Sequence, residues 1–348
     1  MPMTITHDAC IDYDVYGNGP PLLLISGLGF GRWGWFKQVP TLSRHFRTIT
    51  FDIRGEQGLA HGVTDLCAEV VALLDHLGVE KTHVLGTSLG GFVAQELALE
   101  RPDLVDRLVL VCTSYGGVGR EPVSPAALGR MFGWGSLSPE DAARRGLEGA
   151  TSEVYRAEHP EEFDLILRWR RADSPSLSEY YRQAAAGARF NASATVRNIS
   201  SPTLVIHGAQ DRYVPVANAA ALAEAIPDSR LRVIEDAGHL VFIEQAREVN
   251  EEIISFLKPR QMKLSRIPTR QMAGRLVERA REASQRLIST FEPRAPQGTD
   301  ETREERAERD PSRETVERPA LGAFKGWLRR ARTDAGAWIR KLRGRLSR

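Results

Sequence analysis

The sequence has few cysteines and no long apolar run. Only three cysteines occur in 348 residues, and their spacing suits neither a metal site nor a paired disulfide framework. No stretch approaches the roughly 20 apolar residues that a transmembrane helix needs. The N-terminus has no basic region followed by an apolar stretch, so no signal peptide is expected. We therefore predict reduced thiols, no bound metal and a cytoplasmic location.

The small net charge of +2 is distributed unevenly along the chain. Residues 1–259 carry 24 basic and 33 acidic side chains, which gives a net charge of −9. Residues 260–319 carry a net +3, and residues 320–348 carry nine Lys or Arg against one Asp, a net +8. An acidic body followed by a strongly basic end indicates that the end binds an anionic surface or a partner.

Residues 1–259 alternate short apolar runs with longer segments of helical periodicity. An edge strand is predicted at 9–16, and buried strands are predicted at 22–26, 48–52, 83–86, 108–112, 203–207 and 231–235. Apolar residues recur at helical spacing within 66–77 and 92–99. This alternation is typical of a mostly parallel sheet whose crossover helices cover both faces. The predicted fold class is therefore α/β.

The strand pattern stops between residues 114 and 200. This segment is rich in Ala, Arg and Glu, and it is divided into short predicted helices by Pro122, Pro125, Pro139, Pro160 and Pro175. We predict a helical cap insertion at 114–200, inside a core formed by 1–113 and 201–259. It would cover the edge of the sheet at which α/β proteins form their sites.

Two interpretations stay open for the side chains of the insertion. Its aromatic residues either line a pocket or pack the small core of the insertion itself: Phe132, Trp134, Phe163, Trp169, Tyr180 and Tyr181. In the same way, Arg168, Arg170 and Arg171 either hold an acidic substrate or form a solvated helix face.

A candidate nucleophile lies in the segment Gly86-Thr87-Ser88-Leu89-Gly90, between the predicted strand 83–86 and the following helix. A serine in a sharp strand-to-helix turn is held in a strained backbone conformation, and small residues two positions on either side allow the close approach. The turn exposes the Ser88 hydroxyl, while the Leu89 amide at the helix start can stabilise negative charge beside it.

A serine nucleophile needs an imidazole base and an acid that orients it. Asp211 follows the predicted strand 203–207, and His239 follows the next one, 231–235. Both lie at carboxyl ends of strands, and the order Ser, Asp, His is the one expected for this architecture. Asp236 is a poorer candidate for the acid because it shares the loop of His239. His207 could also face the site, but a histidine at a strand end is more often a packing or hydrogen-bonding residue.

The loop after strand 22–26 is expected to supply a second oxyanion donor, the backbone amide of Leu28. This loop also contains Gly29, Gly31 and Gly34 at the spacing of a dinucleotide fingerprint, with Asp52 about 20 residues further on. The first fingerprint glycine should follow the strand directly, and bulky Arg32 and Trp33 would stand where pyrophosphate approaches. We therefore expect no nucleotide and no other cofactor.

Taken together, these motifs resemble the α/β-hydrolase superfamily, in its cap-bearing branch of esterases, enol-lactonases and carbon–carbon bond hydrolases. The resemblance covers about residues 13–258 and rests on the segments 17–21, 52–55, 86–91, 207–211 and 238–239. It implies a sheet of the eight-stranded type, the triad Ser88, Asp211 and His239, and oxyanion donors at Leu28 and Leu89. Two segments depart from the family pattern. Ser26-Gly27 replaces the common His-Gly, and residues 54–59 read Arg-Gly-Glu-Gln-Gly-Leu in place of the usual Arg-Gly-x-Gly-x-Ser.

The function expected from this resemblance is hydrolysis of a carboxylic ester or lactone through an acyl-enzyme on Ser88. A small acyl compound is the expected substrate. Acyl transfer or carbon–carbon bond cleavage by the same triad is the first alternative. A non-catalytic membrane- or partner-binding protein on a hydrolase scaffold is the second. A serine at position 88 argues against epoxide hydrolysis and dehalogenation, which need an aspartate there.

The C-terminal extension has its own pattern. The pattern of residues 260–319 predicts an amphipathic helix followed by a charged, partly disordered linker. Residues 320–348 predict a basic amphipathic helix with an apolar stripe of Phe324, Trp327, Leu328, Ala331, Ala335, Trp338, Ile339, Leu342 and Leu346. Such a helix suits an anionic membrane surface, here the inner face of the membrane, or a protein partner. No nucleic acid is expected, because no reader motif accompanies the charge.

Overall fold

The computed structural model describes residues 3–5, 10–53, 62–117, 121–132, 137–173 and 175–258. All of them belong to the first of the two units into which the chain divides, Met1–Ser289. The predictions for residues 260–319 and 320–348 therefore fall outside the described residues, as do those for Trp134 and the loop 54–59.

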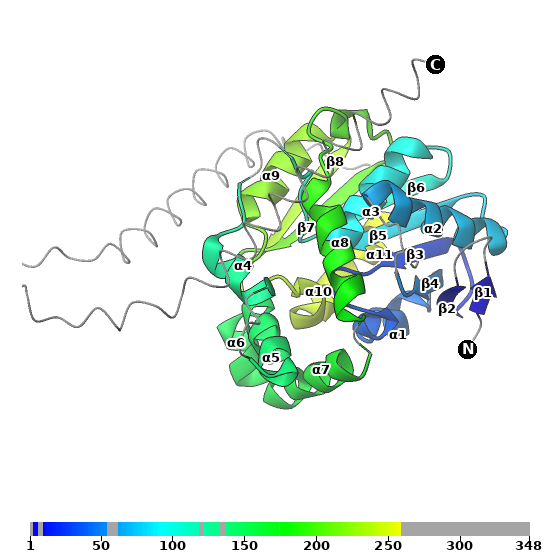
Figure 1. The fold of residues 1–348 in the computed structure, drawn as a ribbon. Coiled ribbons are helices and arrows are strands. Elements are labelled where there is room, and N and C mark those ends of the chain that lie inside the picture. Colours follow the sequence, from blue (N-terminus) through cyan, green and yellow to red (C-terminus); the bar gives the residue numbers. More distant parts are fainter. Residues whose placement is uncertain are drawn as a thin grey trace, which may run out of the picture. The chain divides into compact units, whose positions relative to one another are not determined.

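The described residues are built around an eight-stranded sheet (Figure 1). Its strands are β1 (Met3–Ile5), β2 (Cys10–Tyr16), β3 (Pro21–Ile25), β4 (Arg47–Phe51), β5 (Thr82–Thr87), β6 (Val105–Val111), β7 (Thr203–Gly208) and β8 (Ser229–Ile234). They lie in the order β1-β2-β4-β3-β5-β6-β7-β8, and every pair from β4 to β8 is parallel. The prediction of a mostly parallel α/β sheet is confirmed.

The prediction that residues 9–16 form the edge of the sheet is wrong. β2 pairs with β4 on one side and with the short strand β1 on the other, and both pairings are antiparallel. A strand of three residues is too short to show the apolar and polar alternation by which a strand is recognised from sequence.

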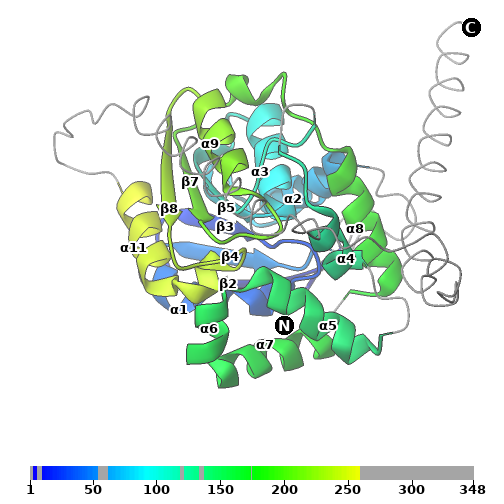
Figure 2. The same ribbon diagram turned by 90° about the vertical axis from the view of Figure 1, so that its left-hand side faces the viewer.

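Both faces of the sheet are covered by helices (Figure 2). These are α1 (Val39–Leu42), α2 (Val63–His76), α3 (Leu89–Glu100), α9 (Val216–Ala225), α10 (Val241–Glu244) and α11 (Ala246–Leu257). Because successive strand residues point to opposite faces, Leu23 and Ile25 of β3 pack in one core cluster with α2, α3 and α9. Leu22 and Leu24 pack in the other with α1 and α11. The apolar runs of the sequence are therefore strands buried on both faces.

Among the described residues, five α-helices lie between β6 and β7, where the helical insertion was predicted. They are α4 (Pro125–Phe132), α5 (Pro139–Ala150), α6 (Glu153–Glu158), α7 (Pro160–Ala172) and α8 (Leu177–Arg189). Three prolines of the predicted segment begin helices, since the fixed backbone angle of proline suits the first helical position. Side chains of α5 and α7 join one core cluster and those of α8 the other. The insertion thus reaches both sides of the sheet, while its boundaries as a domain stay a prediction.

Two short 3₁₀ helices, η1 (Arg32–Trp35) and η2 (Val196–Asn198), complete the description. Within the part of the chain that the structure describes, no helix is long and apolar enough to cross a bilayer.

Helix α3 lies unusually close to the sheet because two glycines remove side chains from the contact. A Cβ atom on Gly90 would lie 2.2 Å from the backbone oxygen of Ile25, and one on Gly86 would lie 2.3 Å from the oxygen of Gly90. Backbone atoms on both sides leave no room for a methyl group. The close approach brings the start of α3, and with it Ser88, against the ends of β3 and β5.

We expect Gly90→Ala to lower the free energy of unfolding by about 3 kcal/mol, because the new methyl group would overlap a backbone oxygen that cannot move alone. The matched control is Gly129→Ala on α4, where a Cβ atom would meet no other atom within 4 Å. This control should gain about 0.5–1 kcal/mol from the lower conformational entropy of alanine. Urea unfolding of both variants measures the difference. Equal stability of Gly90→Ala and the wild type would contradict the packing described.

Candidate active site

Ser88 occupies a strained turn between β5 and α3. Its backbone angles are φ 52° and ψ −115°, a conformation that residues with a side chain rarely adopt. The Ser88 N–H donates to the carbonyl of Val111 at 2.9 Å, and the Ser88 carbonyl accepts from the Thr113 hydroxyl at 2.8 Å. Hydrogen bonds on both sides of the residue therefore hold the strained conformation that the Gly-x-Ser-x-Gly pattern predicts.

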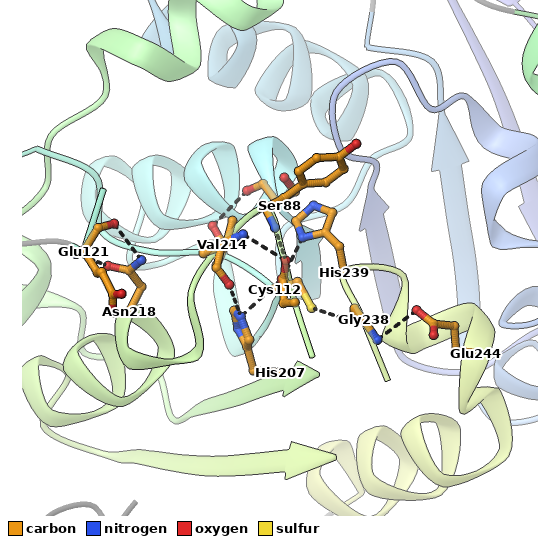
Figure 3. A network of polar contacts seen from close by, with 12 residues as sticks. Ser88, Cys112, Glu121, His207, Val214, Asn218, Gly238, His239 and Glu244 are labelled. Atoms are coloured by element: carbon orange, nitrogen blue, oxygen red, sulfur yellow. Dashed lines mark hydrogen bonds and ion pairs between the residues drawn. The ribbon is translucent and has the colours of Figure 1, made fainter. Parts of the chain in front are cut away.

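Asp211 and His239, far apart in sequence, form a short hydrogen bond (Figure 3). Asp211 follows β7 and His239 follows β8, so the parallel sheet places both at the same edge. The His239 Nδ1 donates to Asp211 Oδ2 at 2.7 Å. Because Nδ1 carries the proton in this arrangement, Nε2 keeps a lone pair, which is the state a general base requires.

Asp211 is held by donors on both of its oxygens. Oδ1 accepts the backbone N–H groups of Tyr213 and Val214, each at 2.8 Å. Burial by itself would raise the pKa of the Asp211 carboxyl, but its partners His239 and His207 outweigh burial and hold that pKa below the usual range. The carboxylate is therefore ionised and fixed in orientation.

His207 contacts the same carboxylate, a role the sequence pattern did not identify. Its fully buried imidazole donates from Nε2 to the Val214 carbonyl at 2.8 Å, and Nε2 also lies 3.2 Å from Asp211 Oδ2. The prediction that His207 is a hydrogen-bonding residue is confirmed. Asp236, the weaker candidate for the orienting acid, is exposed on the loop before His239.

The two predicted oxyanion donors belong to segments that adjoin Ser88, one at the start of α3 and the other in the loop after β3. Leu89 is the first residue of α3, where a backbone N–H has no acceptor within the helix. In the loop after β3, a Cβ atom on Gly27 would lie 3.2 Å from the Ser88 Cβ, so the loop leading to Leu28 packs directly against the serine. Ser26 occupies the position at which the family commonly has histidine. Its hydroxyl donates to the Gly31 carbonyl at 3.4 Å and so links the two ends of the loop 26–31.

Asp52, the acidic residue that accompanies the glycine fingerprint, forms an ion pair within the protein. The Asp52 carboxylate, which would have to hold a ribose, accepts the Arg32 backbone N–H at 2.8 Å and the Arg32 Nε at 3.0 Å. A second carboxylate, that of Asp14, lies 2.9 Å from the same guanidinium. Arg32 thus ties the loop to β2 and to the end of β4, and Asp52 has a structural partner.

Ser88 and His239 border the same pocket, which has a volume of about 560 Å³. Its walls come from the Leu28 loop, from the histidine loop and from the insertion. Of the aromatic residues left open above, Tyr180 and Tyr181 line the pocket, whereas Phe163 is buried in the core and Trp169 packs on Phe36 at 5.0 Å. The insertion therefore both lines the pocket and packs on the core.

The insertion is also joined to the loops that carry Asp211 and His239. Buried Glu244 accepts the backbone N–H groups of Ser152 at 2.8 Å and Gly238 at 3.0 Å. Burial raises the pKa of this carboxyl, although both donors act in the opposite direction. The Tyr213 hydroxyl donates to the Gly146 carbonyl of α5 at 2.6 Å, and its ring meets the His239 ring edge-on at 5.5 Å. No local sequence pattern predicts these contacts of Glu244 and Tyr213.

One cluster of possible metal ligands lies beside the site. Side-chain atoms of Cys112, His207 and Asp211 all fall within 4.8 Å of one another. Asp211 already holds two imidazoles, and burial raises the pKa of the Cys112 thiol well above its usual value, so the thiol stays protonated. His207 and Asp211 already use side-chain atoms in their contacts with Val214, His239 and each other, so the arrangement is explained by these contacts.

Comparison with known proteins gives the same architecture. The family model for the alpha/beta hydrolase fold matches residues 20–246. A pimeloyl-[acyl-carrier protein] methyl ester esterase of Aeromonas hydrophila is 29% identical over 71% of this chain and 99% of its own. Among solved structures, a hydrolase from Pseudomonas aeruginosa PA01 has a TM-score of 0.64 at 29% identity, covering 74% of this chain and 98% of its own. The enol-lactonase from Burkholderia xenovorans LB400 has a TM-score of 0.64 at 25% identity, covering 74% and 99%.

The family match covers well over half of the chain and includes strands β3 to β8, the turn at Ser88 and the loop of His239. The chain therefore belongs to the alpha/beta hydrolase fold family, and it is an enzyme of the hydrolase type.

Proposed function

We propose that this enzyme is a serine hydrolase that cleaves a carboxylic ester or lactone through an acyl-enzyme on Ser88. The observation that carries the proposal is the geometry around one pocket. Ser88 sits in a strained turn, and the imidazole that borders the same pocket is already oriented by a buried carboxylate. This arrangement supports nucleophilic catalysis by a hydroxyl group.

In the acylation step, the Ser88 Oγ attacks the carbonyl carbon of the bound ester while His239 Nε2 takes the hydroxyl proton. The carbonyl oxygen becomes negatively charged and is stabilised by the N–H groups of Leu28 and Leu89. The carbon–oxygen bond to the leaving group then breaks, and His239 returns the proton to the departing alkoxide. The products are an acylated Ser88 and a free alcohol, or a single ring-opened chain when the substrate is a lactone.

In the second step, water hydrolyses the acyl-enzyme. His239 Nε2 removes a proton from the water as its oxygen attacks the acyl carbon, and the same N–H groups hold the second oxyanion. The bond to Ser88 Oγ breaks, His239 returns the proton to the serine, and the carboxylic acid leaves. Asp211 stays ionised throughout and stabilises the imidazolium that forms in each step.

Acyl transfer and carbon–carbon bond cleavage stay alternative predictions, because both could use the same three side chains. They differ from ester hydrolysis in the acceptor or in the bond broken. The pocket favours an acyl compound with apolar groups, since leucine, phenylalanine, alanine and methionine side chains make up much of its wall. We infer that the insertion selects the substrate and excludes water, because it supplies more than half of the residues that line the pocket.

We also propose that residues 320–348 attach the enzyme to an anionic membrane surface. The proposal rests on the net charge of +8 and on the tryptophan-containing apolar stripe. Each basic residue near an anionic surface contributes about 1 kcal/mol, and the apolar stripe adds burial in the headgroup region. A protein partner for the same helix is the alternative, and the cytoplasmic location stays a prediction.

Ser88→Ala should lower kcat for 4-nitrophenyl esters by about 10³-fold or more, because the attacking oxygen is removed. Labelling by a fluorophosphonate probe should be lost as well, while the melting temperature stays close to that of the wild type. The control is Ser193→Ala, which changes an exposed serine whose hydroxyl donates only to Asn191. Unchanged turnover by Ser88→Ala would overturn the proposed nucleophile.

Asp211→Asn should lower kcat by about 10⁴-fold, because an amide cannot hold His239 in the required tautomer. It should also change the response of stability to acid. The folded state lowers the pKa of Asp211, so the carboxylate stabilises the fold at neutral pH and this contribution is lost as pH falls below about 4. The stability difference between wild type and variant should therefore shrink between pH 6 and pH 3. Urea unfolding across this range measures it, and a constant difference would contradict the assignment.

Removal of residues 320–348 should abolish co-sedimentation with phosphatidylglycerol vesicles. The full-length chain should sediment with these vesicles at low salt and be released at high salt, because the attraction is electrostatic. Vesicles of phosphatidylcholine alone provide the uncharged control. Equal sedimentation of full-length and shortened chains would rule out the membrane proposal.

A further inference from the structure

Among the described residues that line the pocket beside Ser88, the Lys, Arg, Asp and Glu side chains are all positively charged. Two arginines, Arg130 and Arg170, line it, and no Asp or Glu occurs among the described residues that form its wall. Most of the remaining wall is apolar or aromatic. Positive charge against walls of low polarity is screened less than charge on an open surface, so it favours a ligand of opposite charge.

Arg170 reaches the pocket from helix α7. Its guanidinium lies over the Phe30 ring at 5.4 Å, next to the Leu28 loop. A Cβ atom on Gly146 would lie 3.8 Å from both terminal nitrogens, and one on Gly29 would lie 3.6 Å from Nη2. These distances place the Arg170 guanidinium beside both glycines, at the wall of the pocket.

Arg130 reaches the same wall from helix α4. Its Cδ atom would lie 3.0 Å from a Cβ atom on Gly149, one turn of α5 beyond Gly146. The two guanidiniums also act on the same phenol: burial raises the pKa of Tyr213 to about 12, and both Arg170 and Arg130 oppose this rise. Tyr213 lies against the His239 ring, so both positive charges act close to the reaction centre.

The other arginines of α7 do not share this position. Arg168 is exposed, and Arg171 forms an ion pair with Glu140 at 2.9 Å. The sequence left open whether these arginines hold an acidic substrate or form a solvated helix face, and residues of the same helix now differ in this respect. Arg168 and Arg171 belong to its solvated face, and Arg170 belongs to the pocket.

We propose that the pocket selects esters or lactones that carry a carboxylate, and that Arg130 and Arg170 bind this carboxylate. This inference rests on the proposed function, and it adds the chemical class of the substrate. A guanidinium offers several N–H donors in a planar arrangement that matches a carboxylate. The apolar walls would hold the chain between the carboxylate and the ester group.

The test compares charged and uncharged esters on the full-length enzyme. Mono(4-nitrophenyl) adipate is paired with 4-nitrophenyl hexanoate, which places the charge on the acyl side. A second pair, 3-carboxy-4-nitrophenyl butyrate and 4-nitrophenyl butyrate, places it on the leaving group. In at least one pair we expect kcat/KM for the charged ester to exceed that for the uncharged ester by about 10–100-fold, the range of charge-assisted hydrogen bonds. High salt should reduce this ratio.

The double variant Arg130→Gln/Arg170→Gln should bring the ratio close to one. Arg168→Gln is the matched control, since it removes the same charge from the exposed side of α7 and should keep the wild-type ratio. Each ratio compares two esters on one protein preparation, so a loss of folded enzyme cancels. A ratio near one in the wild type for both pairs, or a ratio unaffected by the double variant, would overturn the inference.

A binding measurement separates this inference from the proposed function. Calorimetric titration of Ser88→Ala with monomethyl adipate, and with methyl hexanoate as the uncharged control, requires no turnover. Selective binding of monomethyl adipate that disappears when Arg130→Gln and Arg170→Gln are added supports the carboxylate site, even if the wild type hydrolyses none of the esters. In that case only the proposed function fails. Ester hydrolysis without charge preference, together with no selective binding, overturns the carboxylate site alone.

Discussion

The contact between α3 and the sheet is the constraint on which the site depends. Gly90 lets the helix backbone touch the end of β3, and Gly86 lets it touch β5. The sharp turn between β5 and the start of α3, where Ser88 has a φ of 52°, lies at this close contact. The strained residue is held by hydrogen bonds to residues at and just beyond the end of β6. Strain at one residue is thus supported by packing across three strands, which is how rigid scaffolds keep reactive groups in position.

The pocket and the hydrogen-bonded pair of Asp211 and His239 are not independent parts. Tyr213, whose N–H binds Asp211, donates its hydroxyl to a carbonyl of α5, and Glu244 joins the loop of His239 to the start of α6. Helix α5 also lines the pocket through Gly146. A substrate that displaces the insertion would therefore act on the loops that position the proposed acid and base. This coupling gives a physical route by which substrate fit could influence reactivity.

Much of the fold and of the candidate site could be predicted from the sequence. The strand runs, the turn at Ser88 and the positions of Asp211 and His239 after successive strands all follow from local patterns. The insertion is divided into short helices as predicted, and three of its prolines begin one. The edge strand β1 was missed because three residues carry no periodicity. The contacts of His207, Glu244 and Tyr213 were missed for another reason, since each joins segments that only the folded chain brings together.

The sequence by itself determined the fold class and the identity of the three candidate catalytic side chains, because strand burial and turn chemistry are local properties. The tertiary structure decided which neighbouring residues act together. The sequence does not distinguish the three arginines 168, 170 and 171 from one another. Of these three, only Arg170 lines the pocket, together with Arg130 from another helix. Asp52 likewise fits a nucleotide pattern until the fold gives it Arg32 as a partner. Electrostatic and hydrogen-bonding roles depend on distances through space, and those are set only when the helices and strands pack.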